Sequence, residues 1–201
     1  MRAAMGRHCR IVRFLPILLS AVVVVCASPL DAANGAQAAA VNLQGKATNP
    51  LALTPDKVVV LVFVRTDCPV ANRYAPTLQK LAAAYTNKAA FWLVYPSKAE
   101  TAESIEKHDR EYGYKFPALR DPQHVLVKES HAQVTPEVGV FDRGRRLVYH
   151  GRIDNLYVEI GRARRSATTH ELKDAIDAAY AGRALPTSAT QSIGCFISDL
   201  E

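Results

Sequence analysis

The sequence predicts an α/β fold in which helices cover a central sheet, and three observations support this prediction. Residues 58–64 (VVVLVFV) form an unbroken apolar, β-branched run, which is typical of a strand buried on both faces. A helical pattern follows that run after a short turn. Two further apolar segments flank the turn Asp142-Arg143-Gly144 like the arms of a hairpin. The composition agrees, since 201 residues with 49% apolar and 22% charged side chains suit one globular domain and exclude collagen, a coiled coil and wholesale disorder.

The first 38 residues are predicted to be a secretory signal peptide. An arginine-bearing start is followed by an apolar run at 14–27 and by small residues that end in Ala-Gln-Ala at 36–38. The apolar run contains Pro16 and is shorter than the roughly 20 residues that span a bilayer. We therefore expect cleavage after Ala38, no stable membrane insertion, and a secreted or periplasmic protein.

Removal of this leader changes both the charge and the cysteine count. The formal net charge of +6 falls because residues 2–13 contain four arginines, and the remaining excess is too small to indicate nucleic-acid binding. Cys9 and Cys26 leave with the leader, so the mature chain keeps only Cys68 and Cys195. Because an exported protein meets a disulfide-permissive compartment, the chemistry narrows to these two thiols.

Three segments follow the leader. Residues 39–57 are expected to be a lead-in with one short strand, at either 41–43 or 51–53. Residues 58–182 are expected to form the domain that carries the chemistry. Residues 183–201 are expected to form a tail that carries Cys195.

The first unit of the domain is a strand, a tight turn and a helix. Cys68 is predicted to be the last loop residue and Pro69 the first helical residue, a position that proline favours. The helix is expected to continue to residue 85, with a kink at Pro76 because proline removes a backbone donor. The next strand is predicted at 90–95.

Two helices and a hairpin are predicted next. Residues 98–112 and 125–132 have helical spacing and are separated by a proline-bearing loop at 116–122. Residues 137–141 and 146–149 are predicted to pair as the hairpin that ends the sheet.

The last helix and the tail complete the chain. Thr168 and Glu171 fit a capping box, and Gly182 is expected to end the helix. The tail should then lie extended over the surface and bring the Cys195 region to a specific place.

Three segments resemble the thioredoxin fold, and more narrowly its redoxin branch, which includes the alkyl hydroperoxide reductase and thiol-specific antioxidant (peroxiredoxin-like) proteins. They are residues 63–74 (FVRTDCPVANRY), residues 134–137 (VTPE) and the hairpin at 141–151. Cys68 and Pro76 have the separation found between the first active-site cysteine and the kinking proline of thioredoxins. The resemblance implies a central mixed sheet flanked by helices, with a helical insertion and, here, an extended C-terminal tail.

The same resemblance implies the site. Thr135-Pro136 is similar to the dipeptide whose cis-proline lies against the active-site sulfur in this fold. Cys68 would be the reactive thiol and Cys195 its candidate resolving partner. Thr66 and Pro69 would help to shape the site.

The chemistry expected of Cys68 depends on its ionisation, because the thiolate is the nucleophile. A helix N-terminus stabilises thiolate through its free N–H groups. We therefore expect an exported redox protein that acts by peroxide reduction or by thiol–disulfide exchange, with a thiol or dithiol as electron donor and no cofactor. The alternative is that Cys68 is a buried, unreactive cysteine in a protein without redox activity.

A copper-binding module similar to the Sco-type chaperones is the second alternative. Cys68 would hold Cu(I) with His131 or His150, since soft sulfur and imidazole suit that ion. The chain departs from the peroxiredoxin motif, because Leu61 stands where peroxiredoxins place a proline. It also departs from the copper-chaperone motif, because Asn72 stands where those chaperones place a second cysteine. Elsewhere, the arginine-rich stretch between the hairpin and the last helix is expected to be a solvated loop; the alternative is a contact with an anion or an acidic partner, with an Arg152–Asp154 ion pair that orders the loop.

Overall fold

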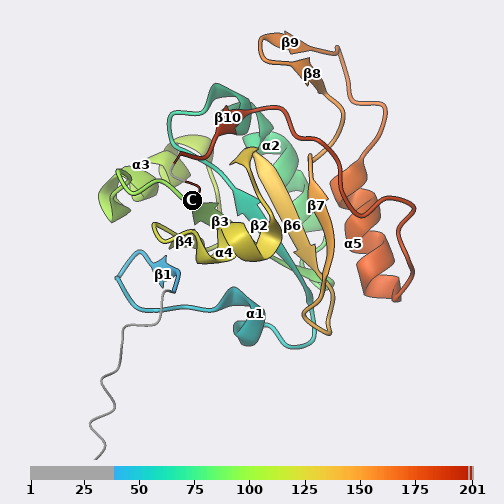
Figure 1. Cartoon of the computed structure of the whole chain (residues 1–201), viewed down its shortest axis with the longest axis horizontal. Coiled ribbons are helices and arrows are strands. Elements are labelled where there is room, and N and C mark those ends of the chain that lie inside the picture. The colour runs from blue at the N-terminus through green and yellow to red at the C-terminus, as the bar shows by residue number, and fades with distance from the viewer. Residues whose placement is uncertain (1–38, 199, 201) are drawn as a thin grey trace, which may run out of the picture. The chain divides into compact units, whose positions relative to one another are not determined.

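A six-stranded mixed sheet forms the centre of the protein, with the strand order β1-β4-β3-β2-β6-β7 (Figure 1). The computed structural model describes residues 39–198 and residue 200. β2, β3 and β4 are parallel, whereas β1, β6 and β7 each run antiparallel to their neighbour. The strands are β1 Val41–Asn42, β2 Val58–Phe63, β3 Ala89–Tyr95, β4 Ala118–Arg120, β6 Glu137–Phe141 and β7 Leu147–Gly151. The predicted α/β class with a central mixed sheet is confirmed.

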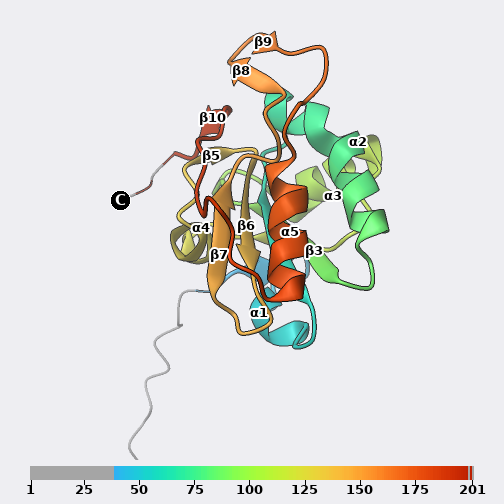
Figure 2. The same ribbon diagram turned by 90° about the vertical axis from the view of Figure 1, so that its right-hand side faces the viewer.

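Helices cover both faces of this sheet (Figure 2). α2 (Pro69–Ala84), α3 (Ala102–Tyr112) and α5 (Glu171–Ala181) pack on one face, and α1 (Pro50–Leu53) and α4 (Val125–Ser130) pack on the other. Every residue of β2 is buried, and alternate β2 side chains enter the two cores. β2 is therefore the central strand that its apolar run predicts.

Two small sheets lie outside the central one. β5 (Val134–Thr135) pairs antiparallel with β10 (Cys195–Phe196), and β8 (Tyr157–Glu159) pairs antiparallel with β9 (Arg162–Ala163). The first of them joins the C-terminal tail to the segment that precedes β6.

Several sequence-based predictions need correction. Of the two candidate lead-in strands, residues 41–42 form β1, but 51–53 belong to helix α1. The predicted loop 116–122 contains β4, which is too short for its periodicity to be recognised. The helix predicted at 98 begins at Ala102, because Thr101 and Ser104 cap it reciprocally.

The predicted capping box of the last helix is also wrong. α5 begins at Glu171 with His170 as its N-cap. The Thr168 hydroxyl accepts instead a 2.7 Å hydrogen bond from the Asn155 side chain. Pro76 lies inside α2 as predicted, and the kink expected there stays a prediction.

The predicted signal peptide lies outside the described residues. Within residues 39–198, no helix is long and apolar enough to cross a membrane.

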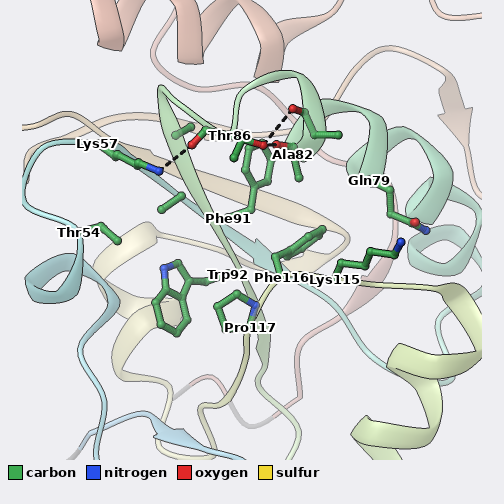
Figure 3. Close-up of a pocket in the computed structure, with 13 residues that line it drawn as sticks. Thr54, Lys57, Gln79, Ala82, Thr86, Phe91, Trp92, Lys115, Phe116 and Pro117 are labelled. Carbon is green, nitrogen blue, oxygen red and sulfur yellow. Dashed lines mark hydrogen bonds between the residues drawn. The ribbon is translucent and has the colours of Figure 1, made fainter.

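One pocket in the described part of the chain is lined by neither cysteine. Its volume is about 560 Å³, and its lining includes Lys57, Phe91, Trp92 and Phe116 (Figure 3). These residues lie where the parallel strands begin, whereas Cys68 follows the end of β2. The pocket therefore belongs to the opposite end of the sheet.

Candidate functional site

Cys68 occupies the N-cap position of α2, at the end of the loop that leaves β2. Its backbone is extended, with φ −86° and ψ 107°, and Pro69 is the first helical residue as predicted. The side chain is 0% exposed, and its thiol donates a 3.0 Å hydrogen bond to the carbonyl oxygen of Thr135. A cysteine at this position faces the unpaired N–H groups of the first helical turn.

The peptide bond between Thr135 and Pro136 is cis, in agreement with the resemblance to the thioredoxin fold. Thr135 is fully buried at the end of β5, and its carbonyl oxygen is the acceptor for the Cys68 thiol. The cis-proline segment and the helix that carries Cys68 therefore meet at the sulfur.

Cys195 reaches the same place from the tail. In the β5–β10 pair, Cys195 lies opposite Thr135 and Phe196 lies opposite Val134. Gly194 allows this approach, because a Cβ atom there would collide with the Thr135 carbonyl oxygen and lie 2.6 Å from the carbonyl carbon. The Gly-Cys pair of the tail is thus fitted to the backbone of the cis-proline segment.

The two thiols differ in acidity. Burial raises the pKa of Cys68, but hydrogen bonds from the Cys195 side chain, the Ala71 N–H and Thr135 outweigh it and hold the pKa below its usual value. Burial and the neighbouring Cys68 sulfur raise the pKa of Cys195 to about 11. Both cysteines are free, and Cys68 is the one of the two that loses its proton first.

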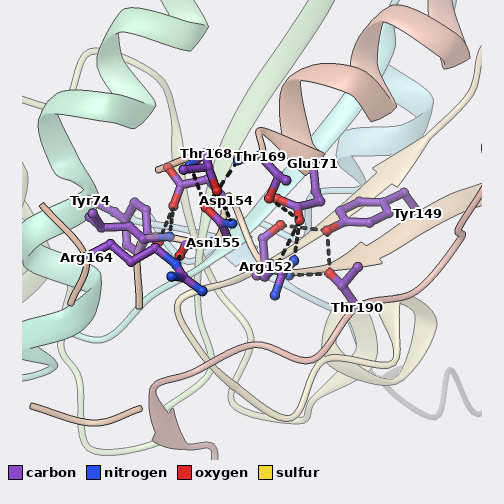
Figure 4. Close-up of polar contacts among 11 residues, drawn as sticks. Tyr74, Tyr149, Arg152, Asp154, Asn155, Arg164, Thr168, Thr169, Glu171 and Thr190 are labelled. Atoms are coloured by element: carbon purple, nitrogen blue, oxygen red, sulfur yellow. Dashed lines mark hydrogen bonds and ion pairs between the residues drawn. The ribbon is translucent and has the colours of Figure 1, made fainter. Parts of the chain in front are cut away.

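The tail is held on both sides of Cys195. Before it, the Thr190 hydroxyl contacts the Tyr149 hydroxyl at 2.6 Å and accepts a 3.1 Å bond from the Arg152 N–H (Figure 4). After it, the Ile197 N–H donates to the Gln133 carbonyl at 2.9 Å, and the Ile197 side chain is buried in the core beside α4. The tail therefore delivers Cys195 to a specific place, as the sequence predicts.

The predicted ion pair between Arg152 and Asp154 is wrong. Arg152 pairs with Glu171, the first residue of α5, through its Nε at 3.0 Å and through its Nη2 (Figure 4). Asp154 instead accepts a 2.6 Å hydrogen bond from the Tyr74 hydroxyl on α2. Arg152 thus stabilises the junction of β7, α5 and the tail.

Both backbone groups of Thr66 in the Cys68 loop are engaged. Its N–H donates to Glu100 Oε1 at 2.7 Å, and its carbonyl accepts from the Asn72 side chain at 3.0 Å. No sequence pattern marks Glu100 as a site residue, and Asn72 stands out only as the position where the copper motif lacks its second cysteine. A carboxylate 34 positions away is beyond any local pattern.

The two candidate copper-binding histidines lie together, but they do not cluster with the cysteines. The rings of His131 and His150 are 5.6 Å apart, and Nδ1 of His150 is 3.7 Å from the Glu137 carboxylate. They line a pocket of about 500 Å³ beneath the tail that neither cysteine lines. The described residues include no group of three or more His, Cys, Asp or Glu side chains placed to hold a metal ion. The copper alternative therefore stays a prediction from the sequence.

Comparison with known proteins identifies the family. Residues 31–150 match the AhpC/TSA family. The chain belongs to the AhpC/TSA family. This assignment confirms the resemblance to the redoxin branch of the thioredoxin fold.

Solved structures agree with the AhpC/TSA assignment. A hypothetical protein from Sinorhizobium meliloti 1021 is 28% identical, with a TM-score of 0.67 over 80% of this chain and 91% of that one. An uncharacterized conserved protein from Geobacillus kaustophilus is also 28% identical, with a TM-score of 0.67 over 79% and 86%. MTB dsbF, solved in mixed oxidized and reduced forms, is 18% identical with a TM-score of 0.52 over 70% and 92%, which supports the fold alone. A comparison with curated proteins gave no significant match.

Proposed function

We propose that the protein is a thiol-dependent oxidoreductase in which Cys68 and Cys195 form and break a disulfide in each cycle. The observation that carries this proposal is the placement of both free cysteines at Thr135: the Cys68 thiol contacts the Thr135 carbonyl at 3.0 Å, and Cys195 lies opposite Thr135 in the β5–β10 pair. Membership of the AhpC/TSA family supports it.

The oxidising half of the cycle begins at Cys68. Its thiolate attacks the terminal oxygen of a hydroperoxide, the O–O bond breaks, and the sulfur becomes a sulfenic acid while an alcohol or water leaves. The Cys195 sulfur then attacks Cys68, loses its proton and expels water as the disulfide forms. When the oxidant is a disulfide, the Cys68 thiolate attacks one of its sulfurs and expels the first substrate thiolate. The Cys195 sulfur then loses its proton, attacks the Cys68 sulfur of the mixed disulfide and expels the second substrate thiol as the Cys68–Cys195 disulfide forms.

The reducing half of the cycle begins at Cys195. In the described structure Cys68 is fully buried, whereas Cys195 is half-buried and its neighbour Phe196 is 78% exposed. A donor thiolate therefore attacks the Cys195 sulfur, and Cys68 leaves as the thiolate. The lower pKa of Cys68 makes it the better leaving group of the two. A second donor thiol then releases Cys195 and leaves with the first as a disulfide.

A non-reducing peptide map by mass spectrometry tests this proposal. The reduced protein is mapped before and after one equivalent of hydrogen peroxide, and in parallel after glutathione disulfide. The expected result is a linked pair of peptides containing Cys68 and Cys195 that dithiothreitol reverses, with no peroxide consumption by Cys68→Ser. Free thiols in every sample, or full turnover in Cys68→Ser, would overturn the proposal.

The two oxidants distinguish the two reaction classes. Fast linkage by peroxide and slow linkage by glutathione disulfide indicates a peroxidase, and the reverse order indicates an exchange protein. Cys195→Ser is the matched variant: it should stop at a sulfenic acid with peroxide and at a mixed disulfide with glutathione disulfide.

We also propose that residues 1–38 export the protein to an oxidising compartment. The support is their sequence pattern, an arginine-bearing start, an apolar run and a small-residue cleavage site. Expression of the full chain in a bacterium, followed by N-terminal sequencing of the periplasmic fraction, should find a chain that begins at Ala39. An uncleaved, membrane-associated product would contradict this proposal.

A further inference from the structure

A polar cluster of two buried side chains, Tyr95 and His108, and two half-buried ones, Asp109 and Asn72, lies behind the Cys68 loop and connects to it through Asn72. Tyr95, the last residue of β3, contacts Nδ1 of His108 and Oδ1 of Asp109, both on α3, at 2.8 Å each. Nε2 of His108 contacts Oδ1 of Asn72 on α2 at 2.8 Å. Asn72 in turn donates to the carbonyl of Thr66, two residues before Cys68. Tyr95 is fully buried and His108 is 3% exposed.

The hydrogen bonds determine where the protons of this cluster lie. The Thr66 carbonyl can only accept, so the Asn72 amide must direct its NH₂ group to Thr66 and its oxygen to His108. The amide oxygen can only accept, so Nε2 of His108 carries a proton. The state of Nδ1 then depends on the Tyr95 hydroxyl.

The Tyr95 hydroxyl has one proton and faces two acceptors. If His108 were neutral and Asp109 ionised, the hydroxyl could satisfy Nδ1 or the carboxylate, but not both. One further proton, on either Nδ1 or the Asp109 carboxyl, satisfies both contacts. It also makes the cluster neutral overall, which is the less costly state for buried groups.

We infer that His108, Tyr95 and Asp109 hold one shared proton, and that this protonated cluster positions Asn72 and thereby the loop that carries Cys68. The three are positioning residues and do not touch the reacting sulfur. The functional half of this inference rests on the redox role proposed for Cys68. The proton-sharing half stands on the contacts alone.

Burial favours the carboxyl as the place of the proton. It lowers the pKa of His108 and raises the pKa of Asp109. Each member of the cluster then donates one hydrogen bond to the next. Asp109 donates to Tyr95, Tyr95 to His108, His108 to Asn72, and Asn72 to Thr66. The remaining ionisable groups that face the cluster are Glu100, Glu106, Glu111, Tyr112 and Tyr114.

Nuclear magnetic resonance on the full chain tests the shared proton. The Asp109 carboxyl carbon and the His108 ring nitrogens should move together in one titration step, with Nε2 protonated throughout. In Tyr95→Phe the two groups should titrate separately. In Asp109→Asn, whose amide donates to Tyr95 at every pH, His108 should show no step. Separate midpoints in the wild-type chain would overturn the inference.

The pH profile of Cys68 alkylation tests the positioning role. Above the midpoint that the resonance experiment finds, the alkylation rate of the wild-type protein should be about fivefold lower than the titration of the Cys68 thiol alone would give. A change of this size corresponds to the loss of one hydrogen bond. Glu111→Gln, which removes an exposed charge facing His108, should keep this second inflection, and Asp109→Asn should lose it. A second inflection that is absent from the wild type, or that persists in Asp109→Asn, would refute the role. Failure of the redox proposal would leave the resonance result unchanged.

Discussion

Replacing Gly194 by alanine should separate Cys195 from Cys68 and leave the rest of the fold intact. The new Cβ would collide with the Thr135 carbonyl and come within 3.1 Å of the Pro136 nitrogen. Both neighbours are backbone atoms of the cis-proline segment, which contacts β6 and Cys68 and has little freedom to shift. The tail should therefore leave β5 rather than displace it.

The size of the effect follows from the contacts that hold the tail end. The β5–β10 pair contributes about two backbone hydrogen bonds of roughly 1 kcal/mol each. Burial of Ile197 contributes roughly 2 kcal/mol more. Loss of about 4 kcal/mol of docking corresponds to roughly a thousandfold lower effective concentration of Cys195 at Cys68.

A glutathione redox titration measures this quantity. The fraction of Cys68–Cys195 disulfide, found by peptide mapping at fixed ratios of reduced to oxidised glutathione, gives the effective concentration directly. Gly45→Ala is the control without a clash: no heavy atom lies within 4 Å of the Gly45 Cβ position, and its φ of +79°, unlike the φ of Gly194, adds a backbone strain of its own that is remote from the cysteines. An equilibrium constant for Gly194→Ala within threefold of the wild-type value would refute the reasoning.

Three further predictions concern the same region. Cys195→Ala removes a donor to the Cys68 sulfur, so the pKa of Cys68 should rise and its iodoacetamide profile should move to higher pH, whereas an unchanged midpoint would show that Cys195 does not stabilise the thiolate. Thr190→Val removes the contacts to Tyr149 and Arg152 and should weaken the attachment of the tail by about 1–3 kcal/mol. Amide exchange and proteolysis within residues 183–194 should then be faster, while amide exchange in the core stays unchanged. Glu171→Gln should lower the free energy of unfolding by about 1–2 kcal/mol at pH 7, because hydrogen bonds from Arg152 and Thr169 outweigh burial and hold the pKa of Glu171 below 4.5. A depressed carboxyl pKa stabilises the fold above 4.5 and loses its effect as pH falls through the lowered value. Urea unfolding at successively lower pH should therefore find a shrinking difference between the two proteins, and a constant difference would contradict the assignment.

Local patterns in the sequence were sufficient for the elements that local physics determines. An all-apolar run can be satisfied only by burial on both faces, and the Cys68–Pro69 boundary follows from the backbone preference of proline. The three residues of β4 are too few to show a period. Thr168 was assigned to a cap because Glu171 stands three positions later, but Asn155, distant in sequence, binds its hydroxyl instead.

The candidate site could be predicted only where it depends on the family pattern. Cys68, Thr135 and Pro136 were found through that pattern, and Cys195 was found because it is the second cysteine of the mature chain. Residue spacing could not predict the ion-pair partner of Arg152, because Glu171 lies 19 residues away in the sequence. The backbone contact that requires Gly194 has no signature in sequence, because a glycine looks the same whether it is needed for a turn or for a close approach.

In the proposed cycle the tail both activates Cys68 and resolves it, and these two roles depend on the same contact. A fully buried sulfur becomes a thiolate only if hydrogen-bond donors compensate for the cost of burying its charge. The largest contribution that lowers the pKa of Cys68 comes from the Cys195 side chain. The thiol that donates to Cys68 is also the thiol that attacks it after oxidation. A tail that moves away exposes Cys68 to substrate but removes this donor, so the exposed sulfur is less ionised. In the proposed cycle the docked tail therefore gives the more ionised sulfur and the undocked tail the more accessible one, and this trade-off favours small oxidants, which need little opening, over large disulfide substrates.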